Sequence, residues 1–287
     1  MTLRTTALAA GLLAAPAGAS ASSTIIAGPI KVKDYSMTIA GTSGSRSIDV
    51  SFTRTSGKAM QMHSYSFASG AAAKVKGARA SIKADLGAYG KIDLKAKLGG
   101  KRKGTVPAGC TGSAGKTRTG TLKGTFKLAA DTTYFNTVSA SKLKAMVLKA
   151  GTLECGGGSG GTPKAPTMLM ATKQDGGAML SFYATKAADG SVNQQAMRMD
   201  DAAVTAPASI MHLISAPGGA AAFAPSADLS SATGSAVAPF FSGAFSFASD
   251  FASGTMATGT LAGDFAAKFD SIGSQAIRGD AMIMAGR

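Results

Sequence analysis

The sequence predicts an all-β protein of two antiparallel β-sandwich or barrel-like modules, with one disulfide and with internal duplication as an open question. The 287 residues include 37 glycines but only 16% charged residues, a composition that disfavours long helices and suits short strands between turns. Apolar and polar residues alternate in short runs, which is the period of β-strands. Aromatic residues make up 6% and tryptophan is absent, so the core must use small and aliphatic side chains.

The alternation assigns side chains to faces. Residues 91–98 place four apolar residues on one face and three lysines and an aspartate on the other. Residues 47–53 and 122–128 follow the same pattern, which is typical of half-buried antiparallel strands. In residues 60–67 it groups Gln61 and His63 with two aromatic residues, against methionine and serine. Glycines at 41–44, 99–100 and 176–177 are predicted to supply turns.

The first 21 residues have the pattern of a secretory signal peptide. Arg4 is followed by an apolar stretch over residues 7–15 and then by Ala19-Ser20-Ala21, a small-residue cleavage site. Cleavage after Ala21 is expected, with cleavage after Ala19 as the alternative. The apolar stretch is shorter than the roughly 20 residues that a membrane-spanning helix needs, and no later segment reaches that length. We therefore expect a secreted protein, extracellular or associated with the cell envelope.

The two cysteines, Cys110 and Cys155, are predicted to form one disulfide, because an even pair in an exported chain is more often bridged than free. The chain-entropy model gives about 4 kcal/mol of stabilisation for a loop of this length. Two buried free thiols are the alternative.

A Gly/Ser-rich stretch at residues 156–166 has the composition of a flexible linker. It predicts a basic β module at residues 22–155 and a Met/Phe-rich β module at residues 167–287.

The octapeptides at residues 119–126 and 258–265 are identical at six of their eight positions. Weaker echoes pair residues 50–52 with 180–182 and residues 84–86 with 227–229. Similar offsets favour two related modules, and chance similarity in a chain rich in glycine, alanine and threonine is the alternative.

The segment at residues 104–155 is framed by the two cysteines and includes the octapeptide, Tyr134–Val138 and the basic Lys142-Leu-Lys144. It resembles a module found in uncharacterised secreted β proteins of GC-rich bacteria. The resemblance covers this segment only. It implies export and a cysteine-framed antiparallel hairpin, and it implies no activity and no functional residues.

Charge is distributed unevenly along the chain. Residues up to Glu154 hold 23 basic and 6 acidic residues, whereas the remainder holds 7 and 9. Alternation places the basic residues outward, so we expect a cationic surface that attracts polyanions such as anionic cell-wall polymer or acidic polysaccharide. Nucleic acid is disfavoured, because Tyr134 and Phe135 are the only adjacent aromatic residues near this run. Lysines that serve only solubility are the alternative. The candidate polyanion-binding residues are Lys91, Lys95, Lys97, Lys101, Arg102 and Lys103.

The sequence offers no enzyme motif in a supporting context. A G-x-S-x-G match at residues 157–161 precedes Thr162-Pro163 instead of a helix. His63 and His212 are too few for a histidine-rich metal site, Glu154 is the only glutamate, and Asp200-Asp201 is the only acidic pair. We therefore predict a non-catalytic binding protein without metal or cofactor.

The second module is rich in methionine. It contains nine of the 14 methionines, several of them two residues apart and hence on one strand face. Together with Phe240, Phe241, Phe245 and Phe247 they could line a barrel interior that carries an apolar or lipid-like molecule, which is the alternative function. Ordinary core packing is the competing interpretation. The nine are Met168, Met170, Met179, Met197, Met199, Met211, Met256, Met282 and Met284.

Overall fold

A computed structural model describes residues 23–44, 47–67, 72–105, 110–113, 115–128, 138–139, 142–149, 152–155, 166–201, 209–253 and 255–285. The predicted signal peptide, the linker up to residue 165, and Tyr134 and Phe135 lie outside these ranges. No helix among the described residues is long and apolar enough to cross a membrane.

The described residues of the first half form twelve strands and one short 3₁₀ helix. They are β1 (Ser23–Val32), β2 (Tyr35–Thr42), β3 (Ile48–Ser56), β4 (Ala59–Phe67), β5 (Ala72–Lys76), β6 (Arg79–Asp85), η1 (Gly87–Tyr89), β7 (Gly90–Lys103), β8 (Cys110–Ser113), β9 (Lys116–Leu128), β10 (Val138–Ser139), β11 (Lys142–Lys149) and β12 (Thr152–Cys155).

In the part of the second half that the structure describes, there are twelve strands and one 3₁₀ helix. They are β13 (Thr167–Asp175), β14 (Ala178–Lys186), β15 (Val192–Asp201), β16 (Ser209–Gly218), η2 (Ala220–Ala222), β17 (Ala224–Pro225), β18 (Ser231–Ser235), β19 (Phe241–Ser242), β20 (Ala244–Ala252), β21 (Met256–Gly263), β22 (Ala266–Phe269), β23 (Gly273–Ala276) and β24 (Gly279–Met284).

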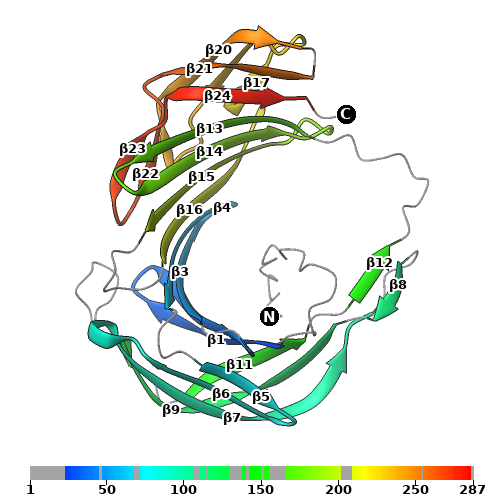
Figure 1. Ribbon diagram of the computed structural model, residues 1–287, viewed down its shortest axis with the longest axis vertical. Helices are drawn as coiled ribbons and strands as arrows, with labels where there is room; N and C mark the ends of the chain where they lie inside the picture. Colours follow the sequence, from blue (N-terminus) through cyan, green and yellow to red (C-terminus); the bar gives the residue numbers. More distant parts are fainter. Residues whose placement is uncertain are drawn as a thin grey trace.

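One large antiparallel sheet runs through both halves (Figure 1). Pairing follows the order β5–β6–β7–β9–β11–β1–β2–β3–β4 in the first half. The second half continues as β16–β15–β14–β13–β24–β21–β20–β18–β17. The two halves meet where β4 pairs with β16. Strands β8 and β12 form a separate pair, and β19, β22 and β23 form a third sheet.

Each half curls around its own apolar core (Figure 1). In the first half the curl brings β5 back into contact with β1 and β2, and in the second it brings η2 against β15. The first core includes Ile39, Phe52 and Leu94, and the second is rich in phenylalanine. Phe182 makes edge or tilted contacts with Phe241, Phe245 and Phe265 there. The two halves therefore share one sheet, but each half has its own core.

The predicted alternation is confirmed, but one predicted turn is wrong. The apolar residues at positions 48, 50 and 52 and at positions 92, 94, 96 and 98 are buried as expected. Gly99 and Gly100 lie within β7 and do not form a turn. They coincide with a bulge in the pairing with β9, between Leu98 and Lys101. Glycine inside a strand often marks such a bulge.

Two glycines allow neighbouring strands to approach closely. Gly124 has a φ of 141°, and a Cβ atom there would lie 2.0 Å from the carbonyl oxygen of Asp93 on β7. Gly263 has a φ of 119°, and a Cβ atom there would lie 2.3 Å from the carbonyl oxygen of Ala244 on β20. Both positions require glycine, because L residues rarely adopt this φ and the carbonyl would clash.

We predict that Gly124→Ala and Gly263→Ala each lower the free energy of unfolding by about 1–3 kcal/mol, measured by urea denaturation. Gly100→Ala is the control, because a Cβ atom there meets no other atom within 4 Å. It should change stability by no more than about 0.5 kcal/mol. Equal effects at all three positions would contradict this account.

Candidate functional site

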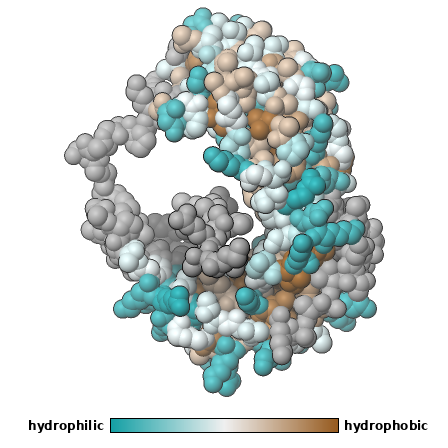
Figure 2. All heavy atoms as spheres, turned by 180° about the vertical axis from the view of Figure 1, so that it is seen from behind, coloured by the Kyte–Doolittle hydropathy of each residue, from teal (hydrophilic) through white to brown (hydrophobic). Residues whose placement is uncertain are grey.

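Ten basic side chains project from one face of the sheet in the first half. This cationic face lies on β5, β6, β7, β9 and β11, on the side opposite the core, and all ten residues are exposed. Figure 2 shows hydrophilic residues on both halves, including several that project from the first half at the bottom of the view. The face consists of Lys74, Lys76, Arg79, Lys83, Lys91, Lys95, Lys97, Lys123, Lys127 and Lys144.

The strand register sets like charges directly opposite one another on the cationic face. Lys95 pairs with Lys123, and Lys91 pairs with Lys127. Arg79 lies between Lys76 on β5 and Lys97 on β7, so three cations form one row across three strands. Directly opposed like charges destabilise a sheet, so this arrangement has an electrostatic cost.

Few anions relieve this repulsion. On the described residues of these strands, the outward carboxylates are Asp85 and Asp93. Lys91 lies 3.3 Å from Asp85, and Lys95 lies 3.9 Å from Asp93. Both pairs are largely exposed, and such ion pairs contribute little. The face therefore keeps a strong positive charge.

The bulge in β7 divides the six predicted polyanion-binding residues. Lys91, Lys95 and Lys97 lie on the cationic face. Beyond the bulge the pairing shifts by one residue, so Lys101 and Lys103 oppose Arg118 and Lys116 on the other face of the sheet. Arg102 projects to the same side of the sheet as the cationic face, but it lies beyond the bulge, opposite Thr117. Alternation alone could not place these three, because a bulge reverses the inward and outward order.

The methionines of the second half do not line an interior with the phenylalanines. Phe240, Phe241, Phe245 and Phe247 are buried in the second core. None of the nine methionines is buried. They alternate with core residues along their strands and lie on the face of the sheet that points away from the second core. The prediction of a shared Met/Phe interior is wrong, and so is ordinary core packing of these methionines. Their i, i+2 spacing does place them together, but on the outer face.

A buried polar cluster lies where the two halves join. Its members are Gln61 and His63 on β4, Asp200 on β15, His212 on β16, and Ser271 in the turn between β22 and β23. His63 and His212 are directly opposed in the β4–β16 pair and are 0% and 3% exposed. Their Nδ1 atoms lie 2.8 Å apart, and the Ser271 hydroxyl lies 2.8 Å from Nδ1 of His212 and 3.1 Å from Nδ1 of His63.

Hydrogen bonds between Gln61 and the backbone determine which ring nitrogens carry hydrogens in this group of five residues, which we call the seam cluster. Gln61 donates its amide to the carbonyl of Lys268 at 3.1 Å, and its oxygen accepts the N–H of Asp270 at 2.7 Å. The same oxygen lies 3.0 Å from Nε2 of His63, so Nε2 carries the hydrogen. Neutral His63 then offers an unprotonated Nδ1, and His212 must donate its Nδ1–H.

The second ring nitrogen of His212 faces an ionic pair. Its Nε2 lies 3.4 Å from Asp200, whose other carboxylate oxygen accepts Nε–H of Arg198 at 2.8 Å. Burial lowers the pKa of His212, although Asp200 opposes this effect. Burial, followed by the charges of His212 and Arg54, lowers the pKa of His63 to about 3. At neutral pH His63 is therefore uncharged.

A second set of contacts across the join lies beside the cluster. Arg54 donates to Asp270 at 2.8 Å, and the hydroxyl of Tyr35 also donates to Asp270. The Arg54 guanidinium lies over the rings of Phe240 and Tyr35, at 5.3 and 5.8 Å from their centres. These contacts tie the start of β2 and the end of β3 to the second half.

The seam cluster contains the residue types of a serine hydrolase triad in Ser271, His212 and Asp200. Two hollows of about 190 and 470 Å³ open beside Arg54, and neither is lined by a residue of the triad. His212 directs its Nδ1–H toward His63, which is itself a weak base because of its low pKa. The arrangement fits a structural hydrogen-bond network and not a nucleophile with its base.

Sequence reasoning missed this cluster, because His63 and His212 are 149 positions apart and each resembles an ordinary strand histidine. The signal that could have found them is their similar place in the two modules: each lies on the fourth strand of its half.

The pKa of His63 predicts a pH-dependent stability. The unfolded state binds a proton near pH 6.5, whereas the folded state does so near pH 3. The unfolded state therefore takes up the proton first, and the free energy of unfolding falls as pH decreases through this window. Between pH 7 and pH 5, wild type should lose about 2 kcal/mol more than His63→Gln, measured by urea denaturation.

Tyr65→Phe is the matched control for this pH series, because it alters a buried neighbour on the same strand face without removing a histidine. It should keep the wild-type pH dependence. A His63→Gln variant with the same pH dependence as wild type would show that His63 titrates normally.

Comparisons with known proteins assign no family. No family model matches the chain, and no curated protein matches it. A crystal structure of an AttH candidate from Nitrosomonas europaea is similar over 92% of both chains, with 7% identity and a TM-score of 0.24. A likeness of this size carries no argument about fold or function.

Proposed function

We propose that the protein is an exported, non-catalytic binding protein whose cationic face contacts an anionic polymer of the cell envelope or its surroundings. The observation that carries this proposal is the in-register opposition of cations across β5, β6, β7 and β9. Solubility alone favours charges of both signs interspersed over a surface. A face that gathers one sign in opposed pairs is better explained by an anionic partner, which relieves the repulsion.

The spacing of the charges suits a repetitive polymer. Neighbouring strands lie about 4.8 Å apart, and alternate residues along one strand lie about 6.8 Å apart. The row through Lys76, Arg79 and Lys97 continues through Thr121 to Lys144 on β11. An extended chain with an anionic group on each unit could meet several cations at once. Each contact would be weak and screened by salt, and the sum would hold the polymer.

Single-stranded nucleic acid is a poor fit for the cationic face. On the described parts of β5, β6, β7, β9 and β11, no outward residue is aromatic, and the described aromatic residue of these strands, Phe126, is buried. Sequence-tolerant binding of single strands relies on aromatic side chains that stack with bases. An acidic polysaccharide or wall polymer needs no such platform.

The test is co-sedimentation of the protein with isolated bacterial cell walls at low and high salt. Replacing Lys95, Lys97, Lys123 and Lys144 by glutamine should weaken binding at low salt at least tenfold. High salt should release the wild-type protein, because the attraction is screened.

The matched control for this test replaces Lys101, Lys103, Lys116 and Lys149 by glutamine. It removes the same charge from the other face of the same strands, so it should bind nearly as wild type does. If both variants lose binding equally, net charge and not the cationic face is responsible. If wild type does not sediment at low salt, the proposed function is wrong.

We also propose the Cys110–Cys155 disulfide, although the side chains of both cysteines lie outside the described residues. Strands β8 and β12 place these two residues directly opposite each other. Opposed Cα atoms in an antiparallel pair lie about 4.5–5.5 Å apart, within the range that a disulfide spans.

The unreduced, unfolded protein should therefore resist alkylation at both cysteines, as measured by mass spectrometry. Cys110→Ser should lower the free energy of unfolding by about 2–4 kcal/mol under oxidising conditions. The reduced wild type and the variant should be equally stable, which separates loss of the bond from loss of the cysteine. Full alkylation without a reducing agent would contradict the bond.

Internal duplication is the third part of the proposal. The first four strands of each half pair in sequence. A late strand of each half returns beside the first, with β11 next to β1 and β24 next to β13. The repeated octapeptide falls on β9 and β21, which hold the same place in the two orders. Its second glycine, Gly124 or Gly263, has a positive φ in both. The weaker echo between β3 and β14 does not join corresponding strands.

A further inference from the structure

Five methionines form a compact group on the outer face of the second half. In the pairing of β13 with β24, Met168 opposes Met284 and Met170 opposes Met282. On the other side of β24, Met256 of β21 opposes Met284. Directly opposed residues project from the same face of a sheet. The five side chains therefore occupy two adjacent rows across three strands, with Thr258 in the sixth position.

Core packing does not explain this group. Among the described residues Met37 is the one buried methionine, and it lies in the first core. The five methionines of the group are half-buried or exposed, and Met256 is 37% exposed. Their neighbours in sequence, such as Leu169 and Ile283, fill the second core from the other side of the sheet. The methionines lie at the surface, in positions where polar side chains are more usual.

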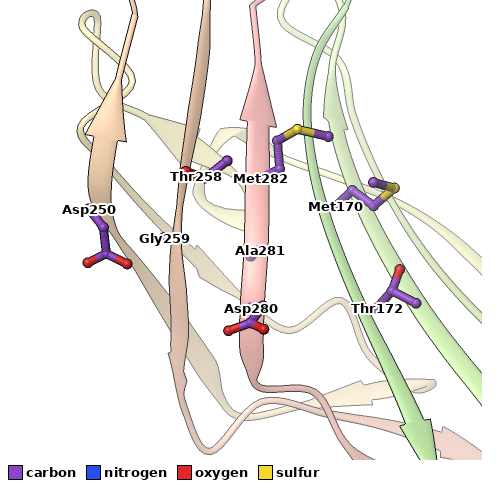
Figure 3. Close-up of a pocket in the computed structure, with 8 residues that line it drawn as sticks. All are labelled: Met170, Thr172, Asp250, Thr258, Gly259, Asp280, Ala281 and Met282. Atoms are coloured by element: carbon purple, nitrogen blue, oxygen red, sulfur yellow. The ribbon is translucent and has the colours of Figure 1, made fainter.

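The group borders a hollow that also contains carboxylates. The hollow has a volume of about 400 Å³ and lies over β13, β24, β21 and β20. Figure 3 shows Met170 and Met282 on neighbouring strands, with Asp280 farther along the strand of Met282 and Asp250 on the outermost strand. Thioether sulfurs and carboxylate oxygens therefore line one open depression.

We propose that this group binds a monovalent soft metal ion, Cu(I) or its analogue Ag(I), through thioether sulfurs. Thioethers are soft ligands that select Cu(I) over the harder divalent ions. Opposed Cβ atoms lie about 4.5–5.5 Å apart, and methionine has three rotatable bonds, so sulfurs from adjacent strands can converge on one ion. Met284 is central, since it opposes both Met168 and Met256. The nearby carboxylates balance the positive charge.

Hard cations fit the group poorly. Calcium takes six to eight oxygen ligands, whereas the carboxylates lining this hollow are Asp250 and Asp280. Zinc prefers thiolate, imidazole and carboxylate ligands. No group of three or more such residues occurs within the described part of the chain.

The test is a Cu(I) titration under nitrogen against a chromophoric Cu(I) chelator, with the two cysteines reduced and alkylated beforehand in every protein so that no thiol competes. Met168, Met170, Met282 and Met284 are replaced together by leucine, which keeps the apolar volume and removes the sulfur. The affinity for Cu(I) should fall at least tenfold, while the far-UV circular dichroism spectrum stays unchanged. Ag(I) should compete with Cu(I) in the wild type.

The control variant replaces Met179, Met199 and Met211 by leucine. These residues form another methionine row, across β14, β15 and β16 on the same face of the sheet. Its Cu(I) affinity should remain within threefold of wild type. Equal losses in both variants, or wild-type affinity in the four-leucine variant, would overturn the proposal. If the wild type and the four-leucine variant both retain a fluorescent fatty acid and neither binds Cu(I), the proposal is overturned in favour of an apolar ligand. Wall binding is measured separately and does not depend on this result.

Discussion

The pairing of β4 with β16 is the contact on which the arrangement of the molecule depends, because it joins two separately cored halves into one sheet. At its centre two histidines meet, and a buried polar pair is costly unless its hydrogen bonds are satisfied. The satisfaction comes from outside the pair: Gln61 is held by the backbone of Lys268 and Asp270, and Ser271 follows directly. The β22–β23 turn therefore satisfies the two histidines only when β4 and β16 pair in the register that sets His63 opposite His212. A shift of one residue between these strands would place the two rings on opposite faces of the sheet.

The faces of individual strands could be predicted from the sequence, because alternation reports burial directly. Ile48, Val50 and Phe52 are buried as their spacing indicates. The bulge at Gly99 and Gly100 could not be distinguished from a turn, since glycine suits both. Alternation also grouped the methionines correctly, but it could not tell which of the two faces meets the core. That choice is made by the competing face, where leucine and phenylalanine bury more apolar surface.

Contacts between residues far apart in the chain could not be predicted from the sequence. His63 and His212 come together only because each lies on the strand at the free edge of its half, and strand order is a property of the whole chain. The disulfide prediction differs in this respect. It used only the number of cysteines and the predicted export, whereas the register that places Cys110 opposite Cys155 depends on the pairing of β8 with β12.

The two halves use the outer face of one sheet in chemically different ways. In the first half the face carries cations in opposition, and in the second half it carries thioethers. Both arrangements add little to the free energy of unfolding or lower it, since opposed lysines repel and half-exposed methionines bury little apolar area. Two separate cores make this possible, because the stability of each half comes from its inner face. The outer face is then free to vary, and if the halves arose by duplication, that freedom is what allowed their surfaces to diverge while Gly124 and Gly263 kept the same backbone geometry.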